Sequence, residues 1–153
     1  MAHPYLARRP PKSTGRESFG PALIEGLLRR AAARHIAEED LVATATAFTA
    51  DSVVLHIRRD LPDNTAALEL ITCGGGGRNL TLLKQLQDAL PECRFLTADE
   101  AGFPGRAIEA SAFALLAYLT ATGLPGNLPG VTGAARPVIL GKILPGRRYR
   151  GVL

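Results

Sequence analysis

The sequence predicts an α/β fold, in which short parallel strands alternate with helices. Residues 68–73 and 94–97 are short apolar runs typical of strands. A glycine run and a helical pattern lie between them, and a long apolar helical pattern follows the second strand. Because such crossovers are right-handed, we expect the two strands to be parallel neighbours with a ligand at their carboxyl ends.

Two helices are expected before the first strand. Residues 1–20 are rich in proline and glycine and predict an extended, irregular N-terminal segment. From Pro21 onward, apolar residues recur on one face of a helix. A second helix is expected over about residues 37–59, and its two apolar stripes predict that it is largely buried. Acidic residues at its start and arginines at its end suit the helix dipole. Residues 62–64 then predict a turn.

The remaining elements follow the glycine run. A helix is expected to begin near Asn79 and to end at Pro91, before the second strand. A loop then leads to a long, small-residue helix over about residues 104–122 that can pack closely. The glycine- and proline-rich tail predicts a packed surface loop at residues 126–129 and a last short strand at 138–140.

Composition excludes several classes of protein. The 153 residues and the net charge of +4 suit one domain, or a single lobe of a larger protein. Aromatic residues make up 5% of the chain and the arginines gather at its two ends, so we expect solubilising tails and no nucleic-acid partner. No uninterrupted apolar run reaches the ~18 residues of a membrane span, and no secretory signal is present. We therefore expect a cytoplasmic protein with no membrane partner.

Cysteine and histidine spacing does not indicate a metal site. Cys73 and Cys93 lack the spacing of metal ligands, and we interpret both as reduced, half-buried thiols. His3, His35 and His56 form no metal constellation with other residues. We therefore expect no metal ligand among the side chains of this chain.

The glycine run is the strongest functional signal. Because glycine lacks a Cβ, the backbone at Gly74, Gly75, Gly76 and Gly77 can approach a ligand closely. The N-terminus of the following helix favours a phosphate or a ribose. We interpret the run as a nucleotide or anion site rather than a plain flexible turn, since consecutive glycines cost considerable chain entropy.

The type of nucleotide loop stays open at this point. The run is not a P-loop, because no Lys-Ser or Lys-Thr follows it at the required spacing. Asn79 stands where a dinucleotide fingerprint requires its third glycine, although Asp99 could accept from a ribose hydroxyl beyond the second strand. A Rossmann-like binder of unrelated chemistry is therefore one alternative.

Four polar side chains lie near the predicted site in the sequence. Asn79 suits a helix N-cap as well as it suits contact with a ligand. Asp99 and Glu100 are loop carboxylates just past a strand. Glu109 lies near the start of an otherwise apolar helix, where a lone carboxylate must be exposed, paired or functional.

Taken together, these segments resemble the C-terminal part of the anhydro-N-acetylmuramic acid kinase family, sugar kinases of peptidoglycan recycling. The matching pieces occur in the order and at the approximate spacing of that family, and they cover nearly the whole chain. They are residues 9–17, the glycine run at 73–79, Asp99 with Gly102 and Pro104, residues 107–117, and residues 124–134.

The resemblance implies an actin-like, ribonuclease-H-like kinase fold whose two lobes close over ATP and Mg²⁺. It assigns residues 21–153 to the C-terminal nucleotide-binding lobe. The implied enzyme hydrolytically opens the anhydro ring of 1,6-anhydro-N-acetylmuramic acid while phosphorylating O6, giving N-acetylmuramic acid 6-phosphate and ADP. In this reaction a carboxylate base activates water for attack at the anomeric carbon, and the released O6 takes the γ-phosphoryl group.

By the same resemblance, Gly74, Gly75, Gly76 and Asn79 hold the nucleotide, and Glu109 lies near the sugar. Three departures from the family pattern are present in this sequence. Gly77 replaces an alanine, Gly130 replaces a serine, and Gly105-Arg106 stands where an alanine and an acidic residue are common. The last of these predicts a poorly capped start for the helix that follows.

A larger departure is that no position matches the family's first phosphate loop or its base aspartate. In the family both belong to an N-terminal lobe, so we expect no catalytic residue in this chain. We predict that the chain alone binds nucleotide weakly, does not turn over and needs the missing N-terminal lobe. Its uncovered apolar face predicts a homo-oligomer. The alternative is a non-catalytic remnant or dimerisation module that keeps the fold.

Overall fold

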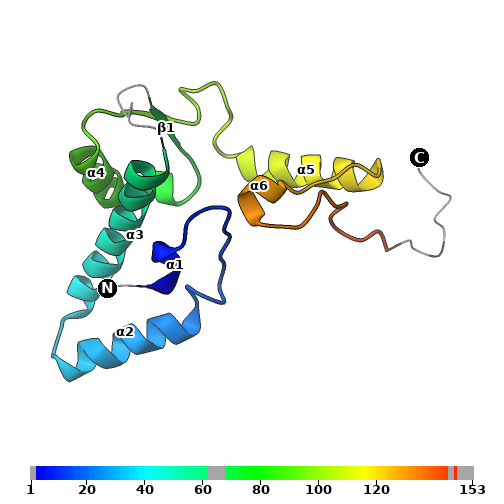
Figure 1. Cartoon of the computed structure of the whole chain (residues 1–153). Helices are drawn as coiled ribbons and strands as arrows, with labels where there is room; N and C mark the ends of the chain where they lie inside the picture. The colour runs from blue at the N-terminus through cyan, green and yellow to red at the C-terminus, as the bar shows by residue number, and fades with distance from the viewer. Residues whose placement is uncertain (1–2, 62–67, 145–146, 148–153) are drawn as a thin grey trace. The chain divides into compact units, whose positions relative to one another are not determined.

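The computed structural model describes residues 3–61, 68–144 and 147, which form two compact units (Figure 1). Unit 1 contains the described residues up to Arg9 and those from Thr14 to Gly105. Unit 2 contains Pro10–Ser13 and the described residues from Arg106 onward. The turn expected at residues 62–64 lies outside the described residues.

The strands and helices of unit 1 confirm most of the predicted elements. Its long helices are α2 (Pro21–Ala33) and α3 (Glu38–Asp60). The parallel strands β1 (Glu69–Thr72) and β2 (Arg94–Thr97) flank α4 (Leu80–Ala89), in register with Leu70 opposite Phe95. The α/β character and the parallel pairing are therefore confirmed.

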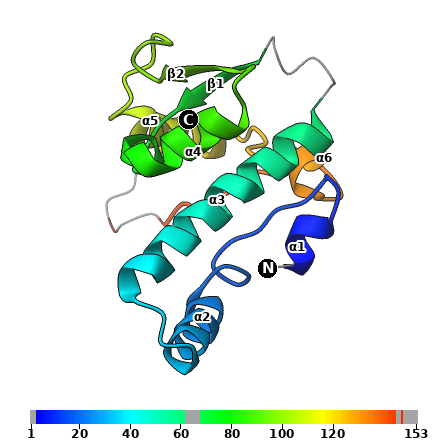
Figure 2. The same cartoon turned by 90° about the vertical axis from the view of Figure 1, so that its left-hand side faces the viewer.

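A small core lies where α3, α4 and the strands meet (Figure 2). Ile57, Leu90 and Cys93 are buried there, and Leu70 and Phe95 pack against them from the same face of the sheet. Arg58 adds a polar tie, because its guanidinium donates to the carbonyl of Ala89 at the end of α4 (2.6 Å). This corner fixes the strands whose ends carry the glycine run.

The burial predicted for α3 is wrong in this structure. Only Ala50 and Ile57 of this helix are buried, while Val42 is 67% exposed. The apolar stripes predicted from the sequence exist, but the described chain covers only part of them. Helix α3 is also long and apolar enough to cross a membrane. The core helix of a water-soluble protein meets the same criterion of length and composition.

The N-terminal segment, expected to be extended, contains the short helix α1 (Pro4–Ala7). His3 caps it by accepting from the backbone N–H of Tyr5 through Nδ1 (3.3 Å), and Pro4 occupies the first helical position. Arg59 holds this segment at the end of α3. Its guanidinium donates to the carbonyls of Leu6 (2.6 Å) and Arg8 (3.0 Å) and to the carboxylate of Asp60 (2.7 Å).

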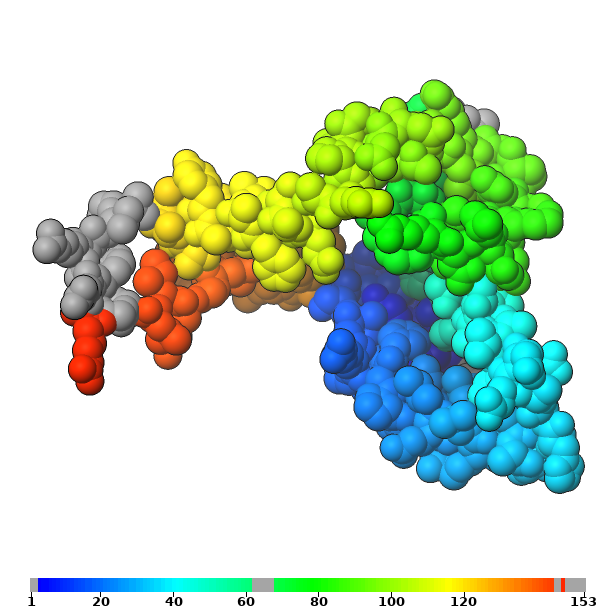
Figure 3. Space-filling model, turned by 180° about the vertical axis from the view of Figure 1, so that it is seen from behind, coloured from blue at the N-terminus to red at the C-terminus, as the bar shows by residue number. Residues whose placement is uncertain are grey.

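Unit 2 consists of α5 (Ile108–Ala121), the short helix α6 (Pro129–Thr132) and a tail that runs back along α5 (Figure 3). Helix α5 begins four residues later than predicted, because residues 99–105 form a loop with Gly102 at φ +82°. Its N-cap residue Ala107 has no side-chain cap, as the sequence predicted. Phe113 on α5 is 67% exposed.

The strand predicted at residues 138–140 is not formed. The backbone of this segment pairs instead with a side chain and a turn: the Val138 N–H donates to Asn127 Oδ1 (2.7 Å), and the Val138 carbonyl accepts from Gly126 N–H (3.1 Å). Asn127 Nδ2 also donates to the carbonyl of Arg136 (3.1 Å). The packed loop predicted at residues 126–129 is therefore confirmed, and the side chain of Asn127 holds it to the segment at residues 136–138.

Candidate functional site

The glycine run follows β1 directly, at the edge of the sheet where both strands end. Thr72 lies opposite Thr97 in the parallel register, so the loops after the two strands share this edge. Ala98 N–H donates to the carbonyl of Thr72 (3.0 Å), which joins the starts of these loops. This is the position at which open α/β sheets bind ligands.

The run forms a defined turn rather than a loose one. Gly74 adopts φ +66°, a left-handed conformation that favours glycine. The Gly77 N–H donates to the carbonyl of Cys73 (3.4 Å), and a 3-10 helix, η2 (Gly76–Arg78), leads into α4. The segment therefore has a specific turn geometry that depends on glycine at position 74.

The glycines of the run differ in what requires them. A Cβ on Gly77 would lie 3.3 Å from the carbonyl carbon of Thr72, so close packing favours glycine there. A Cβ on Gly75 would meet nothing within 4 Å, and one on Gly76 would make only an ordinary contact of 3.9 Å with Leu82. Packing within the described chain thus leaves the outer face of Gly75 and Gly76 open to a ligand.

Asn79 is the N-cap of α4. Its Oδ1 accepts from the backbone N–H of Leu82 at 3.0 Å, and α4 begins at the next residue, Leu80. The capping interpretation is therefore confirmed. Contact of Asn79 with a ligand remains a prediction.

The two carboxylates after β2 organise their own loop. Glu100 Oε2 accepts from the backbone N–H (2.7 Å) and the hydroxyl (2.8 Å) of Thr97, and these hydrogen bonds lower the pKa of Glu100 below its ordinary value. Asp99 Oδ1 accepts from the N–H of Gly105 (3.1 Å). Both side chains are exposed, and Asp99 as a ribose acceptor remains a prediction.

Glu109 lies in the first turn of α5, where its negative charge suits the helix dipole, and it is exposed. It belongs to unit 2, whereas the glycine run belongs to unit 1. Its role near a sugar remains a prediction.

The cysteines and histidines contribute no metal-binding geometry among the described residues. Cys73 is exposed and Cys93 is buried, so the expectation of two half-buried thiols is wrong. Burial, together with the neighbouring Glu92, raises the pKa of the Cys93 thiol. His56 forms a 2.6 Å hydrogen bond through Nδ1 with the carbonyl of Ser52 on its own helix.

Arg59 is a structural residue that sequence reasoning assigned only to the helix dipole. Its hydrogen bond to Asp60 raises its pKa, and its guanidinium holds the carbonyls of Leu6 and Arg8. These carbonyls lie more than 50 positions earlier in the chain. The only local signal was an arginine followed by an aspartate at a helix end.

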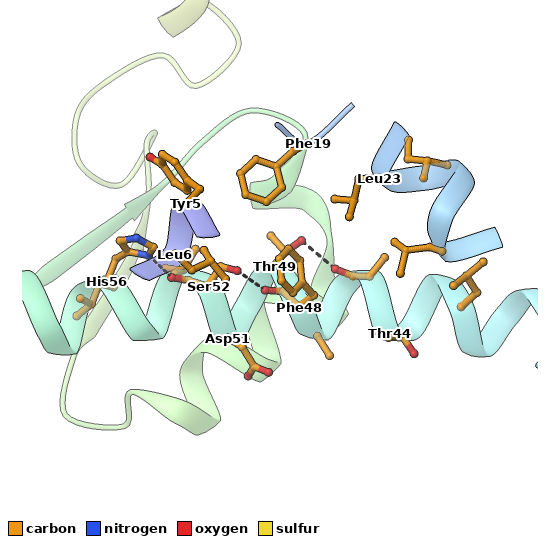
Figure 4. A pocket seen from close by; sticks show the side chains of 17 residues that line it. Tyr5, Leu6, Phe19, Leu23, Thr44, Phe48, Thr49, Asp51, Ser52 and His56 are labelled. Atoms are coloured by element: carbon orange, nitrogen blue, oxygen red, sulfur yellow. Dashed lines mark hydrogen bonds between the residues drawn. The ribbon is translucent and has the colours of Figure 1, made fainter. Parts of the chain in front are cut away.

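A cavity of about 830 Å³ lies elsewhere in unit 1, between the N-terminal segment, α2 and α3 (Figure 4). None of its lining residues comes from the glycine run, and most of them are apolar. A nucleotide needs donors for its phosphates, so the glycine run suits a nucleotide better than this cavity does.

Comparison with known proteins finds a matching family model and similar curated proteins. The sequence model of a family described as "Anhydro-N-acetylmuramic acid kinase" matches residues 1–146. Proteins of that name are 45% identical in Cyanothece sp. strain PCC 7425 (94% of this chain, 37% of the relative) and 46% identical in Gloeobacter violaceus (95% and 37%). The protein of that name in Bacillus cereus strain G9842 is 42% identical (94% and 37%). This chain thus spans about 37% of the length of the relatives that it matches, in their C-terminal part.

Proposed function

This chain belongs to the anhydro-N-acetylmuramic acid kinase family, and from this premise we propose that it is the C-terminal, nucleotide-holding part of a sugar kinase. The match over residues 1–146 is the observation that carries the proposal. The open glycine turn at the carboxyl edge of a parallel strand pair supports it. We further propose that these elements belong to the C-terminal lobe of an actin-like fold.

The proposed reaction of the complete enzyme converts 1,6-anhydro-N-acetylmuramic acid, ATP and water into N-acetylmuramic acid 6-phosphate and ADP. A base takes a proton from water, and the oxygen forms a bond to the anomeric carbon as the bond from that carbon to O6 breaks. ATP with Mg²⁺ supplies the phosphoryl group that O6 accepts. This places the chain in peptidoglycan recycling and amino-sugar catabolism, with a cytoplasmic location.

The role of this chain in that reaction is to hold and orient the nucleotide. Gly74 gives the turn its left-handed conformation, and the open faces of Gly75 and Gly76 fit the close approach of a ligand to the backbone. Asn79 caps the start of α4 through Oδ1, and its Nδ2 group is a further donor that could serve a ligand. In unit 2, Glu109 would contact the sugar.

The catalytic base is not assigned to this chain. No segment of the sequence matches the phosphate loop or the base aspartate of the family. We propose that both come from the N-terminal part of the complete enzyme, and that this chain has no turnover alone.

A second candidate is a non-catalytic remnant or dimerisation module. The observation that favours it is the same lack of a phosphate loop and a base aspartate in this sequence. It differs from the first proposal in one respect, because a remnant would not form an active enzyme when the missing part is supplied.

The test joins this chain to the N-terminal part of the Gloeobacter violaceus relative, in place of that protein's own C-terminal part. ADP release is measured with and without the anhydro sugar, for the chimera and for this chain alone. We expect sugar-dependent release from the chimera only. Release from the chain alone would contradict the assignment as a part, and an inactive, folded chimera would favour a remnant.

A matched pair of variants tests the glycine run. In the chimera, Gly75→Val adds a side chain where the described structure of this chain has open space, so it should leave the fold intact but weaken ATP binding. We expect the KM for ATP to rise by at least about tenfold, which corresponds to about 1.4 kcal/mol. Gly26→Val in α2 is the control, because a Cβ there also meets nothing within 4 Å. Equal KM values in both variants would contradict nucleotide binding at Gly75.

A further inference from the structure

The cavity between the N-terminal segment, α2 and α3, called here the α3 groove, is built from three parts of unit 1 (Figure 4). Phe19 stands between the other aromatic rings, with its centroid 5.7 Å from that of Tyr5 and 6.3 Å from that of Phe48. Leu23 and Ile24 of α2 line it as well, and Ile24 is 54% exposed. The groove is therefore an apolar hollow that water reaches.

The hydroxyl groups of α3 that line the groove are engaged with their own helix. Thr44, Thr49 and Ser52 donate to the carbonyls four residues earlier in α3, at 2.7, 2.9 and 2.6 Å. Figure 4 shows Asp51 pointing away from Tyr5 and Phe19, on the other side of α3. Most of the groove's lining is hydrocarbon and aromatic surface, which fits an apolar protein segment.

The position of the chain's first described residues indicates where that segment comes from. Tyr5 and Leu6 line the groove, and Arg59 holds the backbone of Leu6 and Arg8 at the end of α3. In the relatives, this chain corresponds to the C-terminal 37%, so most of their length precedes the position of Tyr5. A preceding segment would reach the groove at high effective concentration.

We propose that the α3 groove is the docking surface for an apolar segment of the N-terminal part of the complete kinase. This inference rests on the proposed function, because it takes this chain to be the C-terminal part of a longer enzyme. It also accounts for the exposure of α3, whose apolar stripes are covered only in part by the described residues.

The test measures how fast a cysteine on each face of α3 reacts with a maleimide. Ala45→Cys places the thiol in the groove, and Ala43→Cys places it two residues away on the same helix, where the side chain does not line the groove. Both positions are exposed in this chain. Each variant is labelled in this chain and in the chimera described above, and mass spectrometry of peptides separates these thiols from Cys73 and Cys93.

We expect the chimera to lower the labelling rate at residue 45 by at least about tenfold, because interface cores exclude water. The rate at residue 43 should change by less than about twofold, as it does for a site outside the interface. Equal rates at residue 45 in the chain and the chimera would overturn the proposal. Protection at residue 45 in the chain alone that grows with concentration would overturn it in favour of a second copy.

ADP release from the same chimera separates this proposal from the proposed function. An active chimera whose residue 45 labels rapidly leaves the kinase assignment intact and rejects the groove as a docking surface. An inactive chimera in which residue 45 is protected supports docking and rejects the activity. An inactive chimera with an unprotected residue 45 rejects both.

Discussion

Unit 1 buries side chains from α3, α4 and the region around β2, whereas none of the described residues of unit 2 is buried. The corner of unit 1 is held by apolar contacts among Ile57, Leu90 and Cys93. In unit 2, Thr120 of α5 donates to the carbonyl of Leu140 in the tail, and Asn127 joins the loop after α5 to Arg136 and Val138 by hydrogen bonds. The comparison indicates that α5 has an apolar surface but no core of its own.

The largest effect is expected in the core of unit 1. Leu90 is 0% exposed, so Leu90→Ala should lower the free energy of unfolding by about 2–5 kcal/mol. Urea unfolding followed by circular dichroism measures this change. Leu80→Ala is the control, because Leu80 is 79% exposed, and it should change stability by less than about 0.5 kcal/mol. Similar losses for both variants would mean that the buried corner does not dominate stability.

A smaller and local effect is expected in unit 2. Asn127→Ala removes the acceptor of Val138 N–H and the donor to Arg136, and should cost about 1–2 kcal/mol of local stability. Hydrogen exchange of residues 136–140 should then quicken. Asn127→Asp keeps the acceptor and should give an intermediate rate. Unchanged exchange in the alanine variant would show that the tail is held by other contacts.

Two variants of Asn79, the N-cap after the glycine run, distinguish a role in stability from a role in ligand binding. Asn79→Ala removes the acceptor for Leu82 N–H and should lower the free energy of unfolding by about 1 kcal/mol. Asn79→Asp keeps a capping oxygen but lacks the amide donor, so stability should stay while the affinity of the chimera for ADP falls. Calorimetry measures both quantities. Full ADP affinity in the aspartate variant would limit Asn79 to its capping role.

The smallest effect is a pH dependence at the end of β2. The hydrogen bonds from Thr97 lower the pKa of Glu100 from its ordinary value of 4.5 in the folded chain. Its contribution to stability is therefore present above pH 4.5 and is lost as the pH falls through the lower folded value. In the Glu100→Gln variant, the urea concentration at the unfolding midpoint should depend less on pH in this acidic range. An unchanged acid profile in the variant would assign the loss to other carboxylates.

The elements of unit 1 could be predicted because their signals are local. Gly74 follows the first strand and Pro91 precedes the second. Asn79 is a residue type that favours the N-cap position, which predicts the start of α4. The spacing of apolar residues also located the start of α2 and both ends of α3 to within one residue. Each of these signals depends on neighbours within a few positions of the chain.

What could not be predicted depends on distant partners. The segment at Val138 has the composition of a strand, but its backbone pairs with the side chain of Asn127. The carbonyls that Arg59 holds lie far earlier in the chain and leave no periodic pattern. The stripes of α3 correctly predict an apolar surface, but burial also needs a partner that faces it. For the site, the glycine turn and the Asn79 cap were predictable. The hydrogen bonds of Asp99 and Glu100 were not, although their partners Gly105 and Thr97 are close in the chain, because they depend on the conformation of the loop.

The hydroxyls of α3 have a consequence for the life of the chain in a cell. Four hydroxyl groups of α3 donate to carbonyls of their own helix, those of Thr44, Thr46, Thr49 and Ser52. The solvent-exposed surface of α3 is therefore less polar than its amino-acid composition suggests. Cellular quality control responds to exposed hydrocarbon and not to composition. We expect chaperones to retain this chain as an unfinished protein, and proteases to shorten its lifetime, whenever it is made without a partner.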